Sequence, residues 1–152
     1  MLKGKTAIVT GGTRGIGFAI VKKFLDNGAN VALFGSRQET VDKALASLKA
    51  ENPDYPVMGL YPDLCDSDAV AAAFAQVKDQ FGSLDILANN AGVSSRTPLC
   101  DYQPGEFEKI MNLNVTAVYI CCQAAARIMR EQDGGVIINT SSMVSLYGQP
   151  SG

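Results

Sequence analysis

A glycine-rich turn lies between the first apolar run of the sequence and the first helical pattern. Residues 10–17 are Thr-Gly-Gly-Thr-Arg-Gly-Ile-Gly. Glycines permit a tight turn and let the backbone approach a ligand, and the free N–H groups that begin the following helix attract phosphate. The turn therefore predicts a nucleotide-phosphate site, with a purely structural turn as the alternative. The expected contacts are Gly11, Thr13, Arg14, Gly15, Ile16 and Gly17.

The end of the second apolar run bears on which nucleotide would bind. It ends in Phe34-Gly35-Ser36-Arg37, without the acidic residue that NAD sites of this architecture place about 20 positions past the glycine turn. A carboxylate would repel the extra phosphate of NADP, whereas a guanidinium can bind it through two hydrogen bonds. Ser36, Arg37 and Arg14 therefore favour NADP(H) over NAD. In the alternative interpretation Ser36 is a helix cap and both arginines are solvated surface charges.

Two polar residues further along could act on a carbonyl group. Asn114 interrupts the apolar stripe Phe107, Ile110, Ala117 and Cys121 of a predicted helix. We expect its amide to be buried and hydrogen-bonded to backbone, water or a catalytic group, and a purely structural asparagine is the alternative. Ser142 follows the fifth apolar run, where a hydroxyl could bind a carbonyl oxygen, although serines after a strand are more often turn residues.

Composition and charge exclude several other functions. No histidine is present, and Cys65, Cys100, Cys121 and Cys122 lack zinc or disulfide spacing, so we expect reduced packing cysteines and no metal site. The net charge of −2 and the pI near 5.0 argue against a nucleic-acid partner. No apolar run approaches the roughly 20 residues that span a bilayer, and the first residues run straight into a strand, so we expect a cytoplasmic protein without a membrane partner.

Strands and helices must alternate to position these residues. Apolar runs predict strands over 6–10, 30–34, 56–61, 84–88 and 136–140. Periodic apolar residues predict helices after the glycine turn, after a capping box at 36–39, over 67–81 and over 106–130, and Gly28 and Gly82 are expected at helix ends. Residues 1–152 are therefore predicted to be one α/β domain of Rossmann type, a doubly wound parallel sheet in the order 3-2-1-4-5.

This topology brings the polar and glycine residues together. Ligands of such sheets bind beyond the carboxyl ends of the strands. The polar segments follow the five strands, at 10–17, 35–37, 63–64, 89–92 and 139–142. They are expected to meet at one edge.

The motifs together resemble the short-chain dehydrogenases/reductases. The spacing Thr-Gly-x-x-x-Gly-x-Gly is similar to the cofactor turn of that family, and 89–92 is similar to its Asn-Asn-Ala-Gly signature. The resemblance implies that Asp63 and Leu64 contact the adenine ring, that Asn90, Ala91 and Gly92 line the cofactor site, and that Asn114 and Ser142 are active-site residues. It further implies hydride transfer between NADP(H) and a small-molecule alcohol or ketone of hydroxysteroid, 3-oxoacyl thioester or polyol type, and a homo-oligomer.

The sequence departs from that family in one respect. The general acid of the family is the tyrosine of a Tyr-x-x-x-Lys motif after the serine, and this sequence contains no such motif there. Tyr147 has no lysine four positions on, so we interpret it as a loop aromatic. The expectation is that these 152 residues alone lack ordinary turnover, that the later strands are absent and that the fifth strand is a hydrophobic sheet edge. The alternative is a truncated, non-catalytic nucleotide-binding or interaction protein.

Overall fold

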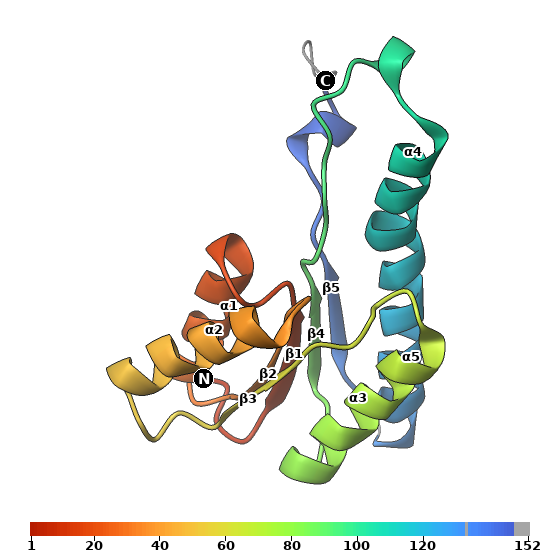
Figure 1. The fold of residues 1–152 in the computed structure, drawn as a ribbon. Coiled ribbons are helices and arrows are strands. Elements are labelled where there is room, and N and C mark those ends of the chain that lie inside the picture. Colours follow the sequence, from red (N-terminus) through yellow and green to blue (C-terminus); the bar gives the residue numbers. More distant parts are fainter. Residues whose placement is uncertain (133, 148–152) are drawn as a thin grey trace.

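The structure is a computed structural model that describes residues 1–132 and 134–147. Its centre is a parallel sheet of five strands in the order β3-β2-β1-β4-β5 (Figure 1). The predicted fold class and strand order are confirmed. The strands are β1 (Thr6–Thr10), β2 (Asn30–Phe34), β3 (Val57–Leu60), β4 (Ile86–Asn89) and β5 (Val136–Asn139).

Helices cover both faces of the sheet, as the apolar strands require. Helices α1 (Gly15–Asp26) and α2 (Gln38–Glu51) lie on one face, and α3 (Ser67–Phe81) and α5 (Ala117–Glu131) lie on the other (Figure 1). Successive β1 residues point to opposite faces, so that Val9 joins the cluster under α1 and α2, and Ile8 joins the cluster under α3 and α5. The sheet is therefore held between two separate apolar cores, one on each face.

Helix ends agree with the sequence in part. Gly28, just after α1, and Gly82, after α3, have the positive φ angles of 86° and 87° expected of helix ends. The capping box predicted at 36–39 is wrong: the cap residue of α2 is Arg37, without a side-chain hydrogen bond, and Glu39 pairs with Lys43. Side chains near a helix start have several possible partners, and here an i,i+4 ion pair prevails.

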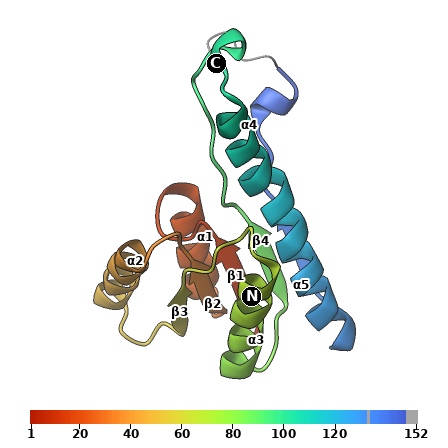
Figure 2. The ribbon, with the colours of Figure 1, turned by 45° about the vertical axis from the view of Figure 1, so that its right-hand side comes forward.

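The long helix predicted over 106–130 is a composite. It comprises α4 (Pro104–Met111), a π-helical turn η2 (Asn112–Thr116) and α5. Both views show α4 extending beyond the sheet, beside the segment that follows β4 (Figures 1 and 2). Phe107 on α4 is consequently 56% exposed although it lies on the predicted apolar stripe. The π turn contains the predicted site residue Asn114, and such turns are frequent at functional sites.

Short 3-10 helices η1 (Leu99–Asp101) and η3 (Met143–Ser145) follow the extended segments after β4 and β5. The fifth strand is the predicted open edge, because Val136 and Ile138 are exposed large apolar side chains. Among the helices of the described residues, none combines the length and the hydropathy needed to cross a bilayer.

Candidate functional site

A cavity of about 770 Å³ opens at the carboxyl edge of the sheet. Segments that follow β1, β2, β3 and β4 line it, as the topology predicts. Twelve of the thirteen residues predicted to bind cofactor are among the lining residues, and Arg37 is not. The volume of the cavity lies within the range of small-molecule and cofactor sites. The lining residues are Gly11, Thr13 to Gly17, Phe34 to Ser36, Tyr61 to Leu64, Asn90 to Val93, and Leu113.

The glycine turn packs tightly against the start of α1. Gly11 and Gly15 have positive φ angles of 64° and 55°. A Cβ on Gly17 would lie 2.1 Å from the Gly11 carbonyl oxygen and 2.6 Å from Asn90 Nδ2. Helix α1 has no side-chain cap at Arg14 and no acidic residue in its first turn. The first backbone N–H groups of α1 are therefore available to an anion, as a pyrophosphate requires.

Thr10 was missed by the sequence analysis and holds two parts of the cavity wall together. Its side chain is 2% exposed, and its Oγ1 accepts hydrogen bonds from the backbone N–H groups of Asn90 and Ala91, both at 3.0 Å. Asn90 Nδ2 in turn donates to the Thr10 carbonyl oxygen at 3.3 Å. A hydroxyl at the end of an otherwise apolar strand is the signal that could have identified Thr10.

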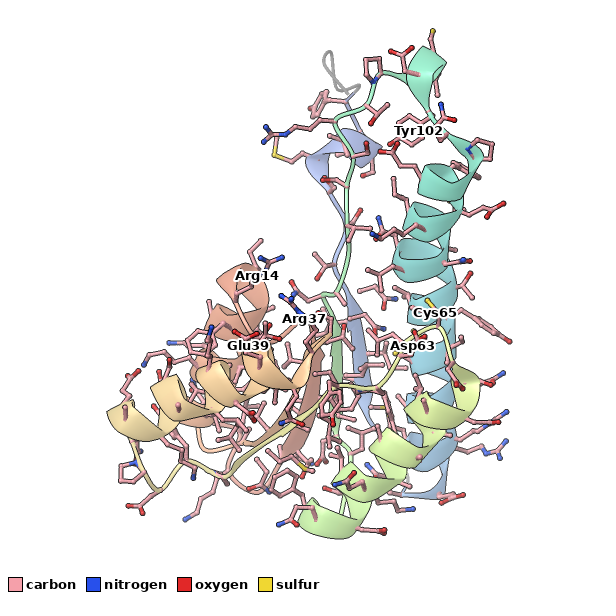
Figure 3. All side chains as sticks on the ribbon, viewed as in Figure 1. Arg14, Arg37, Glu39, Asp63, Cys65 and Tyr102 are labelled. Atoms are coloured by element: carbon pink, nitrogen blue, oxygen red, sulfur yellow. The ribbon has the colours of Figure 1, made fainter. Side chains whose placement is uncertain are left out.

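The end of β2 lies against the glycine turn. A Cβ on Gly35 would be 2.7 Å from Thr13 Cγ2, so these two segments touch. Ser36 and Arg14 both line the cavity. Figure 3 shows Arg14 and Arg37 on the side of the sheet where α1 and α2 begin, and Asp63 on the side toward α3. Asp63 is the one carboxylate among the lining residues, and its Oδ1 accepts from the backbone N–H of Cys65 at 2.9 Å.

Asn114 binds the backbone of the segment that leaves the cavity. Its Oδ1 accepts from the Val93 N–H at 2.9 Å, and its Nδ2 donates to the Val93 carbonyl oxygen at 2.7 Å. The predicted hydrogen bonding to backbone is confirmed, but the predicted burial is wrong, because Asn114 is exposed. The helix runs beyond the sheet at this point, so its apolar stripe is no longer covered there (Figure 2).

Ser142 lies on the neighbouring segment, which follows β5. Asn89 of β4 pairs in register with Asn139 of β5, so Gly92 and Ser142 each lie three positions beyond that pair on adjacent parallel strands. Ser142 is exposed, does not line the cavity, and accepts weakly at Oγ from the Val144 N–H at 3.4 Å. Within the described residues its hydroxyl donates no hydrogen bond. It is therefore free to donate to a ligand.

The remaining candidates contribute less. Tyr147 is 69% exposed, in agreement with a loop aromatic. Burial raises the pKa of Cys121 to about 12, so this thiol stays protonated at neutral pH and acts as a packing residue. Cys65 and Cys100 are also free thiols, but the expected packing role is wrong for them, because both are exposed. In the part of the chain that the structure describes, no group of acidic or cysteine side chains is arranged to hold a metal.

A family model decides the assignment of this geometry. The model described as short chain dehydrogenase matches residues 5–152. The chain belongs to the short-chain dehydrogenase family. Members of this family are oxidoreductases that bind a nicotinamide cofactor, which agrees with a cavity built on the glycine turn and the Asn-Asn-Ala-Gly segment.

Relatives within the family differ in substrate and cofactor. The chain is 66% identical over 152 residues to a 3alpha-hydroxysteroid dehydrogenase of Mediterraneibacter gnavus, covering all of this chain and 61% of that protein. A solved NAD+-bound xylitol dehydrogenase superposes with a TM-score of 0.92 at 31% identity, covering 99% of this chain and 57% of that one. A metagenomic short-chain oxidoreductase in complex with NADP superposes with a TM-score of 0.84 at 36% identity, covering 93% of this chain and 63% of that one. The chain thus spans less than two thirds of the length of each.

Proposed function

We propose that the protein containing this chain is an NADP(H)-dependent hydroxysteroid dehydrogenase that interconverts a hydroxyl and a ketone at position 3 of a steroid. The observation that carries this proposal is the 66% identity, over the whole chain, to a 3alpha-hydroxysteroid dehydrogenase. The proposal includes a small-molecule substrate, a homo-oligomeric assembly and a cytoplasmic location. A polyol or a 3-oxoacyl thioester is the competing substrate class.

The residues present fit a dinucleotide. In this proposal the glycine turn and the first N–H groups of α1 bind the pyrophosphate, because α1 begins without a side-chain cap and without an acidic residue in its first turn. Five other predicted contacts also line the cavity: in this proposal Asp63 and Leu64 contact the adenine ring, and Asn90, Ala91 and Gly92 line another part of the cofactor site. Bound NADP(H) donates or accepts the hydride.

The positive charges of two arginines support a preference for NADP(H), which carries a 2′-phosphate, over NAD(H). Arg14 and Ser36 both line the cavity, no acidic side chain lies at the end of β2, and Arg37 adjoins Ser36 in the chain. In the described residues neither arginine forms a salt bridge. Two such guanidinium groups favour a phosphate over a ribose hydroxyl. Arg37 would have to turn its side chain toward Ser36 to contribute.

Ser142 and Asn114 are the residues that we assign to the substrate side. The Ser142 hydroxyl would donate to the carbonyl oxygen of the substrate as negative charge develops there. Asn114 already uses one donor and one acceptor of its amide on Val93, which leaves one of each for a water molecule that relays a proton. Asn114 would therefore position the cavity wall and bind water at the same time. Tyr147 is assigned no role in proton transfer, because it is exposed and has no lysine four positions on.

Turnover measurements test the substrate class. The protein should oxidise a 3α-hydroxysteroid with NADP+ at a kcat/KM at least about tenfold above that for xylitol, and should reduce a 3-oxoacyl thioester no faster than the corresponding 3-ketosteroid. A higher kcat/KM with the polyol or the thioester would refute the steroid assignment. Binding of NADPH without turnover of any of the three classes would support the alternative of a non-catalytic nucleotide-binding protein.

The charge reversal Arg37→Asp tests the cofactor preference. With Gly35 and Ser36 intact, it should raise the Kd of NADPH at least about tenfold, because a charged hydrogen bond is lost and a repulsion added, and should change the Kd of NADH little. Arg127→Asp, the same change on exposed α5, is the matched control and should leave both constants unaltered. If Arg37→Asp left the Kd of NADPH and the Kd of NADH at their wild-type values, the role of Arg37 in a preference for NADP(H) would be contradicted.

A further inference from the structure

One carboxylate outside the cofactor cavity binds two hydroxyl groups of the segment after β4. Glu106 Oε1 accepts from Thr97 Oγ1 at 2.9 Å and from Ser95 Oγ in a short hydrogen bond. The Thr97 backbone N–H donates to Ser95 Oγ at 2.9 Å, which closes the cluster. Glu106 is the third residue of α4, where the N-terminal end of the helix dipole favours a negative charge. All three residues are half-buried.

This cluster is the second of two attachments of the same segment to the helix. Asn114 holds the backbone at Val93, which lines the cofactor cavity, and Glu106 holds Ser95 and Thr97. Residues 94–97 therefore form a short bridge from the cavity wall to the start of α4. Figures 1 and 2 both show this segment running along the helix beyond the sheet. The shape of the bridge depends on side-chain contacts, because no strand pairing supports it there.

The bridge lies where a substrate must approach. The paired strands β4 and β5 end at Asn89 and Asn139, Gly92 and Ser142 each follow three positions later in the chain, and Gly92 leads directly into Val93 and the bridge. A ketone that accepts a hydrogen bond from Ser142 would meet this segment at its side.

We propose that Glu106 is a positioning residue that fixes residues 94–97 as one wall of the substrate cleft. This assignment rests on the proposed function in placing the substrate beside Ser142, while the attachment itself depends only on the contacts above. Loss of the carboxylate would free the bridge without altering the glycine turn that binds the cofactor. The effect should therefore fall on KM for the substrate and leave the Kd of NADPH unchanged.

Hydrogen exchange measures the attachment in the protein without substrate. In Glu106→Ala the backbone N–H of Thr97, which donates to Ser95 Oγ, should exchange about tenfold faster, whereas the amides of β1 and β2 should keep their wild-type rates, which also shows that the fold is intact. Thr97→Val removes one donor to Glu106 and keeps Ser95 Oγ as the acceptor of this N–H, and it should also increase the exchange rate. Glu106→Gln keeps the oxygen acceptor and should restore slow exchange. Glu108→Ala, on the exposed side of α4, is the matched control.

Steady-state kinetics then separate positioning from mere structure. Glu106→Ala should raise KM for the steroid about tenfold with the Kd of NADPH within about twofold of wild type, and Glu106→Gln should reverse most of the increase. Unchanged exchange at the Thr97 N–H, or an unchanged KM despite faster exchange, would overturn the role of Glu106. Absence of steroid turnover in the wild-type protein would instead overturn the proposed function, and the exchange rates together with KM for whichever ketone is reduced would decide the role of Glu106.

Discussion

Replacement of Thr10 by valine tests how the cofactor cavity is assembled. Thr10 Oγ1 accepts two backbone hydrogen bonds at 3.0 Å, from the N–H groups of Asn90 and Ala91, and valine removes this one acceptor while keeping the shape. A buried donor left without a partner costs about 1–3 kcal/mol, and both donors here are half-buried, so the lower end applies to each. Thr10→Val should therefore lower the free energy of unfolding by about 2 kcal/mol. It should also weaken NADPH binding, because both residues line the cavity.

Thr6 provides a matched control on the same strand. It is also buried, but its Oγ1 accepts one long hydrogen bond of 3.4 Å, from Ser83 Oγ, which also donates to Asp85 at 2.8 Å. Thr6→Val should therefore cost about 0.5 kcal/mol or less. Urea unfolding followed by circular dichroism measures both values, with equal m-values as the check that the two transitions are comparable. If Thr10→Val destabilised the protein no more than Thr6→Val does, the role given to the Thr10 hydroxyl would be refuted.

Two further substitutions follow from the structure. Gly17→Ala should abolish measurable NADPH binding, because its Cβ would lie 2.1 Å from the Gly11 carbonyl oxygen. In the control Gly105→Ala, in the first turn of α4, the new Cβ meets no atom within 4 Å, and this variant should bind NADPH normally. Equal NADPH affinities of the two variants would contradict the tight turn. Burial raises the pKa of Asp85, but hydrogen bonds, the strongest from Lys5, outweigh burial and hold the pKa below the ordinary 3.8. A carboxyl with a lowered pKa in the folded state stabilises above its unfolded pKa and loses that contribution as pH falls. Asp85→Asn should thus be less stable than wild type at neutral pH and lose less stability on acidification below about pH 4, and parallel stability curves for the two proteins would disprove this.

The sequence predicted the parts of the site that depend on strand order. Once the alternation of strands and helices sets the order 3-2-1-4-5, the segments that follow parallel strands must meet at one edge, and residues as distant as Gly11, Ser36, Asp63 and Asn90 do line one cavity. This prediction needs no side-chain detail, because the direction of each strand alone decides where its carboxyl end lies.

Local choices between competing partners could not be predicted in the same way. The residues at 36–39 have the spacing of a capping box, yet Glu39 pairs with Lys43 and α2 begins without a side-chain cap. Helical periodicity likewise predicts one helix over 106–130 and cannot detect the π turn, because a single wide turn shifts the phase of the stripe only slightly. The inference from periodicity to burial failed for Asn114 for another reason: the helix runs beyond the sheet there, and periodicity does not show where a stripe is left uncovered.

Asn114 is one of two amide side chains that attach the helix to the ends of β4. Gln132, just after α5, binds Leu84 as Asn114 binds Val93: its Oε1 accepts from the Leu84 N–H at 3.1 Å, and its Nε2 donates to the Leu84 carbonyl oxygen at 2.7 Å. Leu84 precedes β4 and Val93 follows it, so one amide side chain binds the backbone at each end of this strand. Between them, Asn89 Nδ2 contacts Cys122 Sγ at 3.3 Å.

Leu84 and Val93 lie outside β4, and their backbone N–H and C=O groups pair with these side chains. One amide side chain can satisfy a backbone donor and a backbone acceptor at once. The two amides therefore fix the register of the helix against the strand, one at the edge where the cofactor cavity opens and one at the opposite edge. Because α4, η2 and α5 form one continuous run, the same register also sets where Glu106 meets Ser95 and Thr97. A polar residue that interrupts an apolar helical stripe can thus mark a docking point on strand backbone, and in the proposed function the position of the substrate cleft depends on that docking as much as on the cofactor turn.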